Sequence, residues 1–254
     1  MKRILIKIGG ELAGDEGQLR ILAGDLGELR DSSPCLMVHG GGAELTGLEK
    51  KMGLDPVFRD GIRITSPEEM PYVDMVLSGS INKRIVRIFQ SCGINAVGIS
   101  GSDGRTFVGT SIGSESRTAE ISAIDTRLVE LLLEGGYFPV ISSTSMDGER
   151  GIGLNINADS AAFGLAGTLE VRYLVFLSNI PGILKAGKQI PSLSVQEASR
   201  EIRDGTVTGG MIPKVKASIE ALERGVEKIC IGEFRERGDL EKLLSGRSGT
   251  QIHL

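Results

Sequence analysis

The stretch Leu154-Asn155-Ile156-Asn157-Ala158-Asp159-Ser160-Ala161-Ala162 decides how the rest of the chain is interpreted. Its polar residues Asn155, Asn157 and Asp159 alternate with apolar ones. Alternation is the period of an extended chain, so we expect the three side chains to face one side. The Ala-rich residues 160–169 then predict a helix, whose N-terminus would attract anions. In the alternative interpretation, Asn157 or Asp159 only caps that helix.

Strands and helices alternate along the chain on both sides of this stretch. Apolar, β-rich runs predict strands at residues 2–8, 35–38, 96–100, 138–143, 173–177, 227–231 and 249–254. Helical spacing predicts helices at residues 15–30, 44–52, 66–92, 125–134, 160–169, 194–203 and 239–244, and one that ends near residue 224. This alternation predicts an α/β fold, a three-layer α/β/α sandwich around a mainly parallel central sheet.

Some segments carry more specific local signals. Ser66 with Glu69 and Ser194 with Glu197 predict capping boxes, and Pro71 is expected to disturb the helix over 66–92. Residues 56–65 predict a hairpin that turns at Asp60-Gly61. Residues 182–189 resemble a phosphate-binding loop, but Gln189 replaces the required hydroxyl, so a second hairpin is expected there. Residues 144–153 are expected to form a loop, and residues 107–123 give no clear pattern.

Composition excludes several classes of function. The 254 residues carry a formal net charge of −4 and no Trp, which disfavours nucleic acid and anionic membranes as partners. No apolar run approaches the roughly 20 residues that a membrane helix needs, and no signal peptide is visible. The three cysteines, Cys35, Cys92 and Cys230, lack metal-site spacing and are interpreted as reduced thiols. We therefore expect a cytoplasmic protein without a protein-bound metal.

Asn155, Asn157 and Asp159 are called the polar row, and four segments would need to meet for this row to act in catalysis. They are Lys7-Ile8-Gly9-Gly10, Gly40-Gly41-Gly42, the polar row itself, and Gly209-Gly210 with Lys214. Glycine turns let backbone N–H groups approach oxyanions closely, and two lysines held by one carboxylate add positive charge. Such an arrangement suits phosphoryl transfer, where catalysis is mostly positioning and charge neutralisation.

Each of these signals also has a simpler explanation. Lys7 can be an exposed edge lysine, and the three glycines can be a tight connection between strand and helix. Arg63, on the expected hairpin, can grip a carboxylate or lie on the surface. His39 is interpreted as a packed turn histidine rather than as a catalyst.

Taken together, these residues resemble the amino acid kinase family. The matching motifs occur in the family's order and span nearly the whole chain: Lys7-Ile-Gly-Gly10, Val38-His-Gly-Gly-Gly42, Asp60-Gly-Ile-Arg-Ile-Thr65, Asn155-Ile-Asn-Ala-Asp159, Leu177-Ser-Asn-Ile-Pro-Gly182 and Gly209-Gly-Met-Ile-Pro-Lys-Val215. The resemblance implies one domain over residues 1–254. Its N-terminal lobe, 1–150, would bind the substrate and form a dimer, and its C-terminal lobe, 151–254, would bind the nucleotide.

The resemblance also implies a role for individual residues. Catalysis falls to Lys7, Lys214 and Asp159. Substrate binding falls to Gly41, Gly42, Arg63, Asn155 and Asn157. Nucleotide binding falls to Gly9, Gly10, Ser178, Asn179, Gly182, Gly209, Gly210 and Met211.

The implied reaction transfers the γ-phosphoryl group of ATP to a side-chain carboxylate and yields an acyl phosphate. Within the family, the pattern is most similar to the kinases that act on N-acetyl-L-glutamate in arginine biosynthesis, with Mg²⁺ held through the nucleotide phosphates and a homodimeric assembly. Asn179, where those kinases often have Asp, also resembles kinases of carrier-protein-linked aminoadipate. The polar residues 111–118 leave the acyl group open, so N-succinylglutamate or carrier-linked glutamate is an alternative. A non-catalytic ligand-binding homologue is another.

Overall fold

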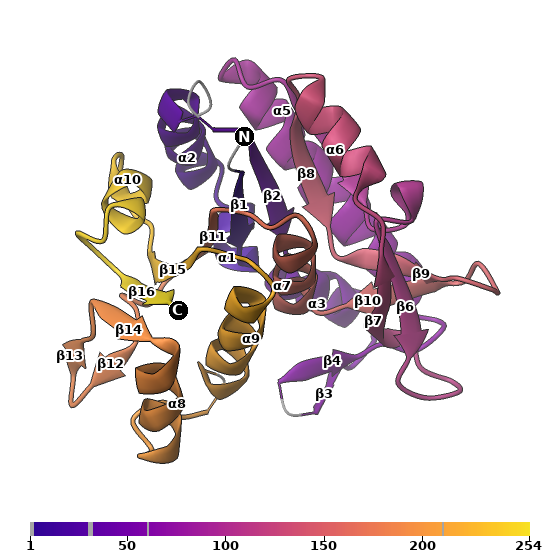
Figure 1. The fold of residues 1–254 in the computed structure, drawn as a ribbon. Helices are drawn as coiled ribbons and strands as arrows, with labels where there is room; N and C mark the ends of the chain where they lie inside the picture. The colour runs from indigo at the N-terminus through magenta and orange to yellow at the C-terminus, as the bar shows by residue number, and fades with distance from the viewer. Residues whose placement is uncertain (1–2, 30–32, 60, 210) are drawn as a thin grey trace.

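A sheet of eight strands forms the centre of the molecule. The computed structural model describes residues 3–29, 33–59, 61–209 and 211–254. The strand order is β14-β16-β15-β11-β1-β2-β8-β5 (Figure 1). The strands are β1 (Ile4–Ile8), β2 (Cys35–His39), β5 (Ala96–Ser100), β8 (Phe138–Ser142), β11 (Tyr173–Ser178), β14 (Ser192–Ser194), β15 (Lys228–Glu233) and β16 (Thr250–His253). Every neighbouring pair is parallel except β15 and β16, so the mainly parallel sheet is confirmed.

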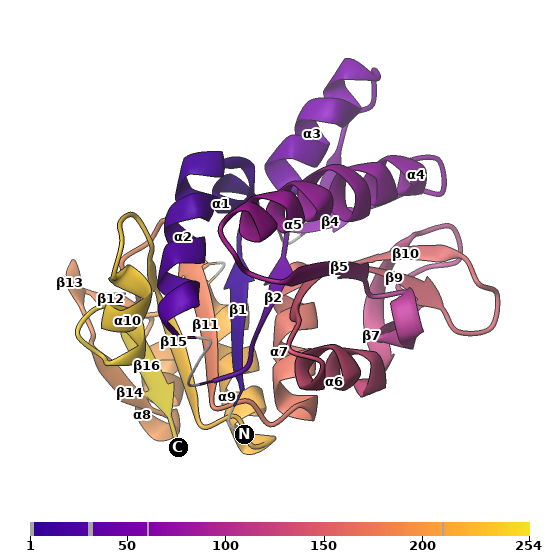
Figure 2. The ribbon, with the colours of Figure 1, turned by 90° about the horizontal axis from the view of Figure 1, so that it is seen from above.

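Each face of this sheet supports a separate hydrophobic core. In β1, Leu5 belongs to one core, while Ile4 and Ile6 belong to the other. This division follows from the strand period, because successive side chains point to opposite faces. Figure 2 shows helices on both sides of β1 and β2, which confirms the three layers.

The helices separate between the two faces according to the core that they complete. The first core includes side chains from α6 (Arg127–Glu134), α7 (Ala158–Thr168), α8 (Val195–Arg203) and α9 (Met211–Glu223). The second core includes side chains from α1 (Gly10–Gly14), α2 (Glu16–Leu29), α3 (Gly42–Lys51), α4 (Met70–Val73), α5 (Asn82–Ser91) and α10 (Asp239–Leu244). A short 3₁₀ turn, Asp103–Arg105, lies outside both groups.

A small closed barrel stands beside the sheet and was not predicted. Its strands are β6 (Phe107–Ser111), β7 (Thr118–Ile124), β9 (Thr144–Asp147) and β10 (Gly153–Ile156). The prediction of a loop over 144–153 was therefore wrong for residues 144–147 and 153, which belong to strands, and is confirmed for residues 148–152, which connect them. These strands are short and pair in mixed directions with distant partners, as β6 does with β9, so local sequence carries little of the signal.

Both expected hairpins form. Strands β3 (Val57–Arg59) and β4 (Ile62–Ile64) pair antiparallel, as do β12 (Leu184–Lys185) and β13 (Lys188–Gln189). The predicted turn residue Asp60 lies outside the described residues.

The long helix predicted over 66–92 is interrupted, but not at Pro71. It consists of α4, a π-helix at Asp74–Ile81, and α5. Pro71 lies in the first turn of α4, where a proline is tolerated because its missing N–H would have no helical partner. The capping box forms as expected: the Ser66 N–H donates to the Glu69 carboxylate at 2.6 Å, and the Glu69 N–H donates to the Ser66 hydroxyl at 3.3 Å.

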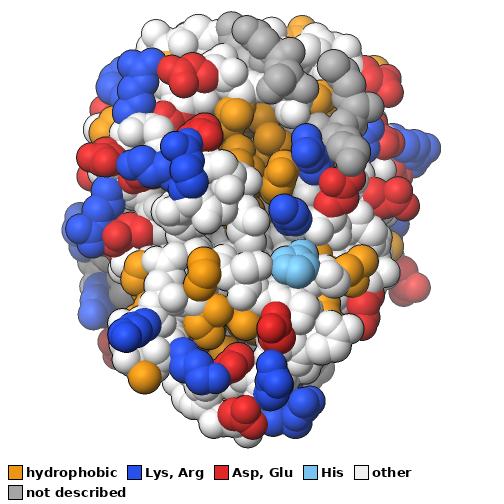
Figure 3. Space-filling model, turned by 60° about the vertical axis from the view of Figure 1, so that its left-hand side comes forward, with side chains coloured by type: hydrophobic (Ala, Val, Ile, Leu, Met, Phe, Trp, Pro, Cys, Tyr) orange, Lys and Arg blue, Asp and Glu red, His pale blue; other side chains and the backbone are white. Residues whose placement is uncertain are grey.

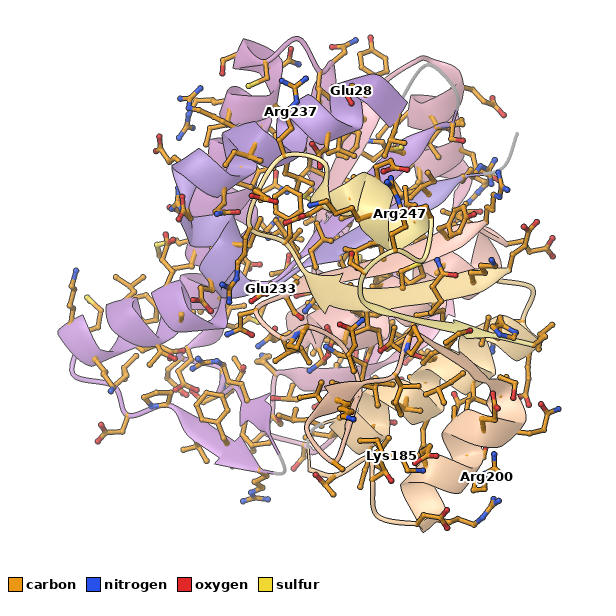
Figure 4. The ribbon with its side chains drawn as sticks, turned by 90° about the vertical axis from the view of Figure 1, so that its left-hand side faces the viewer. Glu28, Lys185, Arg200, Glu233, Arg237 and Arg247 are labelled. Carbon is orange, nitrogen blue, oxygen red and sulfur yellow. The ribbon has the colours of Figure 1, made fainter. Side chains whose placement is uncertain are left out.

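The surface mixes charges of both signs, as one face shows in Figure 3. In Figure 4, Arg237 lies close to Glu28 of α2, with which it forms an ion pair at 2.6 Å. Exposed pairs of this kind contribute little to stability, because water and salt screen them. Within the described parts of the chain, the helices are too short or too polar to cross a membrane.

Candidate active site

The order of strands in the sheet reverses at β1. Strands β2, β8 and β5 lie on one side of it, and β11 and β15 lie on the other. In open α/β sheets, ligands bind beyond the carboxyl ends of the strands at such a switch point. Gly9-Gly10 follows β1, Gly40–Gly42 follows β2, and Asn179 follows β11. The topology therefore gathers three of the predicted segments at one edge.

Two lysines and one carboxylate meet at this edge. Lys7 Nζ, from β1, lies 2.5 Å from Asp159 Oδ1, and Lys214 Nζ, from the first turn of α9, lies 3.4 Å from Asp159 Oδ2. The Lys214 ammonium also lies 5.1 Å from the centre of the Phe176 ring. Burial alone would raise the pKa of the Asp159 carboxyl. The two ammonium groups lower it by more than burial raises it, so the pKa is below its ordinary value. Asp159 is therefore an anion that holds two cations.

The polar row is only partly extended. Asn155 lies on β10, but Asn157 is the N-cap of α7, and its side-chain oxygen accepts from the N–H groups of Asp159 (2.8 Å) and Ser160 (3.2 Å). Asp159 lies inside the first helical turn. The expectation that three alternating side chains share one face was therefore wrong for Asp159, which the helix directs toward the lysines.

The two glycine turns contact each other through their backbones. A Cβ atom at Gly10 would lie 3.1 Å from the carbonyl carbon and the Cα of Gly41 and from the nitrogen of Gly42. Gly41 is the N-cap of α3 and offers no side chain to the first N–H groups of that helix. These N–H groups lie beside the cavity that Gly41, Gly42 and Ala43 help to line.

Two cavities open from the lysine–aspartate cluster. The first, of about 450 Å³, extends toward the end of β15 and is called the β15 cavity. The second, of about 610 Å³, extends toward β10 and is called the β10 cavity. Both are lined by Lys7, Gly9 and Gly10. Ligands in the two cavities would thus meet at Lys7.

In the β10 cavity, Arg63 is firmly bound rather than free. One guanidinium nitrogen contacts the fully buried Glu49 carboxylate, and the other donates to the Thr46 hydroxyl at 2.5 Å and the Gly42 carbonyl at 3.2 Å. The Phe58 ring lies 4.7 Å from the guanidinium carbon. The alternative of a surface arginine is therefore excluded, since the side chain is only 9% exposed.

The other two predicted substrate residues also line the β10 cavity. Asn155 donates its side-chain N–H to the Thr65 hydroxyl at 2.9 Å, and Asn157 combines its capping role with a place in the cavity wall. The structure therefore brings together Gly41, Gly42, Arg63, Asn155 and Asn157.

The predicted nucleotide residues divide into two groups. Ser178 and Asn179 line the β15 cavity, and the Asn179 amide donates to the Glu11 carboxylate at 3.1 Å. Gly182, Gly209 and Met211 are absent from the walls of both cavities. At Gly182, whose φ is +136°, a Cβ would lie 2.6 Å from Thr250 Oγ1, so packing against β16 requires a glycine there. Gly210 lies outside the described residues.

Sequence reasoning missed much of the β15 cavity wall. The missed residues come from α1, the junction between α1 and α2, α2, and the end of β15: Glu11, Leu12, Asp15, Gln18, Glu233, Phe234 and Arg235. Figure 4 shows Glu233 at the end of its strand, and an ion pair at 2.5 Å joins it to Arg235. Their position in the sequence could have indicated them, because residues 233–235 follow a parallel strand at the edge of the sheet where ligands bind.

The sequence of this chain matches the model of the amino acid kinase family over residues 2–233. It is 37% identical to an acetylglutamate kinase from Bradyrhizobium diazoefficiens, over 98% of this chain and 90% of that protein. It is 39% identical to the acetylglutamate kinase of Nautilia profundicola, over 99% of this chain and 91% of that protein.

Solved structures share the fold at lower identity. The smu.665 protein of Streptococcus mutans superposes with a TM-score of 0.84 at 24% identity, covering 99% of this chain and 98% of that one. A carbamate kinase from Giardia lamblia, bound to AMP-PNP, gives a TM-score of 0.70 at 16% identity, covering 99% of this chain and 98% of that one.

Proposed function

The chain belongs to the amino acid kinase family, and we propose that it phosphorylates N-acetyl-L-glutamate. The γ-phosphoryl group of ATP would pass to the side-chain carboxylate and give N-acetyl-L-glutamyl 5-phosphate, in arginine biosynthesis. The observation that carries this proposal is the meeting of two cavities at Lys7, Gly9 and Gly10. A reaction that joins two substrates needs two such spaces with the charge-stabilising groups between them.

In this proposal ATP occupies the β15 cavity and extends its phosphates toward Lys7 and Lys214. The described residues hold no group of three or more His, Cys, Asp or Glu side chains that could bind a metal ion. Mg²⁺ would accompany ATP, held mainly by its phosphate oxygens, whose charge it would partly neutralise.

N-Acetylglutamate would occupy the β10 cavity, with its α-carboxylate at Arg63 and Asn155 and its side-chain carboxylate at the glycine turns. A carboxylate oxygen forms a bond to the γ-phosphorus while the bond from that phosphorus to the bridging oxygen of ADP breaks. The attacking carboxylate is already ionised at neutral pH, so no general base is required. Lys7 and Lys214 would stabilise the charge on the moving phosphoryl group, and Asp159 would hold both lysines.

ATP-dependent formation of an acyl hydroxamate tests this function. Hydroxylamine traps acyl phosphates, so we expect a product with N-acetyl-L-glutamate and little with free glutamate or aspartate. A product with only N-succinylglutamate or N-acetylaminoadipate would keep the mechanism and change the substrate. No product with any of these compounds, while ATP still binds, would leave a carrier-dependent kinase or a non-catalytic homologue.

Arg63 offers a test of the assignment of the β10 cavity. Arg63→Lys keeps a cation beside Glu49 but loses the planar fork, so we expect KM for N-acetylglutamate to rise about 10–100-fold with KM for ATP unchanged. Arg63→Ala is a poorer probe. It leaves the Glu49 carboxylate buried and unpaired, which costs about 3–5 kcal/mol of stability.

A companion variant separates the loss of affinity from the loss of stability. Arg63→Ala/Glu49→Gln removes both charges, and it should recover stability without recovering KM. A raised KM for ATP with an unchanged KM for the amino acid would contradict the assignment.

We also propose a homodimer that works in the cytoplasm, where Cys35, Cys92 and Cys230 would stay reduced. Among the described residues, strand β5 lies at the edge of the sheet without a further strand partner, and Met75, on the neighbouring π-helix, is 57% exposed. The unpaired N–H and C=O groups of an edge strand form a template for pairing with another chain. Light scattering should give about twice the 27.0 kDa of one chain.

Met75→Glu should lower that mass toward one chain. The matched control is Met52→Glu at the C-cap of α3, where the side chain is 53% exposed, and it should leave the mass unchanged. A monomer in the unmodified protein would refute the dimer.

A further inference from the structure

The Gly40–Gly42 turn rests on a buried histidine for which the proposed chemistry has no role. His39 was interpreted as a turn residue, but it is the last residue of β2 and is completely buried. Its Nδ1 lies 3.0 Å from the Gly40 carbonyl oxygen. A carbonyl only accepts, so Nδ1 carries the hydrogen. Its Nε2 lies 3.2 Å from the Asn82 amide nitrogen and accepts from it. Both ring nitrogens therefore have assigned partners.

The ring is also held in its neutral form. The pKa of His39 is lowered to about 4, chiefly by burial; the bond to Gly40 opposes this shift, and the charge of nearby Lys83 adds to it. His39 thus stays uncharged at physiological pH and works as an oriented hydrogen-bond donor.

Asn82 fixes the ring to the rest of the sheet. It is the first residue of α5, immediately after the π-helix, and is fully buried. Its amide nitrogen also lies 2.9 Å from the Val140 carbonyl of β8 and 3.3 Å from the Ile99 carbonyl of β5. The space for Asn82 exists because Gly98 has no side chain, since a Cβ there would lie 2.0 Å from Asn82 Oδ1.

The π-helix meets the same turn from a second direction. A Cβ at Gly41 would lie 2.2 Å from Cδ1 of Ile81 and 2.6 Å from Cδ2 of Leu77. A π-helix adds a residue to each turn and so alters where the side chains after it point. Here it directs Leu77 and Ile81 at Gly41, and Asn82 at His39.

We propose that the His39–Asn82 pair positions the glycine turn, so that the Gly41 N–H faces the substrate in the β10 cavity. This inference rests on the proposed kinase function. The Gly40 carbonyl and the Gly41 N–H belong to one planar trans peptide and point in opposite directions. The His39 bond that draws the carbonyl inward therefore turns the N–H away from the buried ring. The Gly40 N–H is fixed as well, because it donates to the Ile8 carbonyl at 3.1 Å.

Two substitutions of His39 separate positioning from simple packing. The amide nitrogen of an asparagine can occupy the place of Nδ1, whereas that of a glutamine occupies the place of Nε2. His39→Asn should keep the bond to Gly40 and hold kcat within about threefold, while His39→Gln should lose that bond and lower kcat about 10²-fold. KM for ATP should change little in either variant. Equal kcat values in His39→Asn and His39→Gln would overturn the proposal.

A third substitution acts without touching His39 or the turn. Gly98→Ala displaces Asn82 from the far side, and we expect kcat to fall about tenfold because the ring loses its support. Unchanged kcat in Gly98→Ala, with Asn82 shown to be displaced, would also overturn the proposal. This variant keeps the test decisive if a His39 variant fails to fold.

Nuclear magnetic resonance gives a readout that does not depend on turnover. The chain has only two histidines, His39 and His253, so His253→Asn assigns both. His39 should show the Nδ1–H tautomer and should not titrate between pH 5.5 and 8. The Nε2–H tautomer in the unmodified protein would refute the inference. Absent turnover of every acylated substrate, with this tautomer present, would instead count against the proposed function.

Discussion

Replacing Lys214 with alanine is expected to lower kcat for acyl phosphate formation by about 10²–10³-fold while leaving the protein folded. The ammonium group lies 3.4 Å from Asp159 Oδ2 and borders the β15 cavity. A fixed charge of this kind stabilises the transition state more than the ground state, and its loss costs about 3–4 kcal/mol of barrier. Steady-state kinetics should therefore show the loss in kcat rather than in KM for N-acetylglutamate.

The same helix offers a matched control for this prediction. Lys216 is exposed on α9, two residues along, and does not line either cavity. Lys216→Ala should change kcat by less than about twofold, since an exposed lysine contributes little. Lys7→Ala should behave like Lys214→Ala, because both ammonium groups contact one carboxylate. Near-normal turnover in both variants would refute the catalytic assignment.

The sheet was predictable because its strands are locally marked. β2, for example, consists of four buried apolar residues, 35–38, followed by the buried His39 and then by glycines, and β5 forms at the predicted residues 96–100. In a parallel sheet covered on both faces, strands need apolar side chains throughout, and this is a strong local pattern. The short barrel strands lack that pattern. β9 reads Thr-Ser-Met-Asp and forms only because β6 and β10 pair with it.

The π-helix could not be predicted from its own residues. Asp74–Ile81 has ordinary helical spacing, and Pro71 gave a misleading local signal. Residues from distant parts of the chain contact the π-helix. The Ser78 hydroxyl lies 2.8 Å from that of Ser142 and 2.6 Å from that of Thr144, and Ile81 packs against Gly41. Such partners are more than 35 residues away in sequence, so periodicity alone gives no indication of them.

Much of the candidate site could be inferred because its chemistry requires unusual residues. Lysines and consecutive glycines are costly in a core, so Lys7 and Gly40–Gly42 stood out. The buried partner of Arg63 did not, because Glu49 lies on a helix whose polar pattern is that of a solvated surface. Asp159 was predicted as a site residue, but it was expected on an extended segment and lies in a helix. The helix begins two residues earlier than its Ala-rich composition indicated.

Asp159→Asn should lower kcat by about 10³-fold, because one neutral amide replaces the charge that holds both lysines. Asp159 Oδ1 and Oδ2 each contact a different ammonium group, so the substitution releases Lys7 and Lys214 together. Two unneutralised cations repel each other, and their misplacement alone can cost about 10²-fold. The carboxyl needs no protonation for this role, and its lowered pKa keeps it ionised. The effect should therefore persist throughout the neutral pH range.

A double-mutant cycle distinguishes this holding role from an independent catalytic one. If Asp159 acts through the lysines, Asp159→Asn/Lys214→Ala should be little slower than either single variant, because groups that act as a unit are not additive. Independent roles would instead multiply the two losses and lower kcat by about 10⁵-fold or more. A fully multiplicative loss would contradict the holding role and leave Asp159 with a separate contact to the substrates.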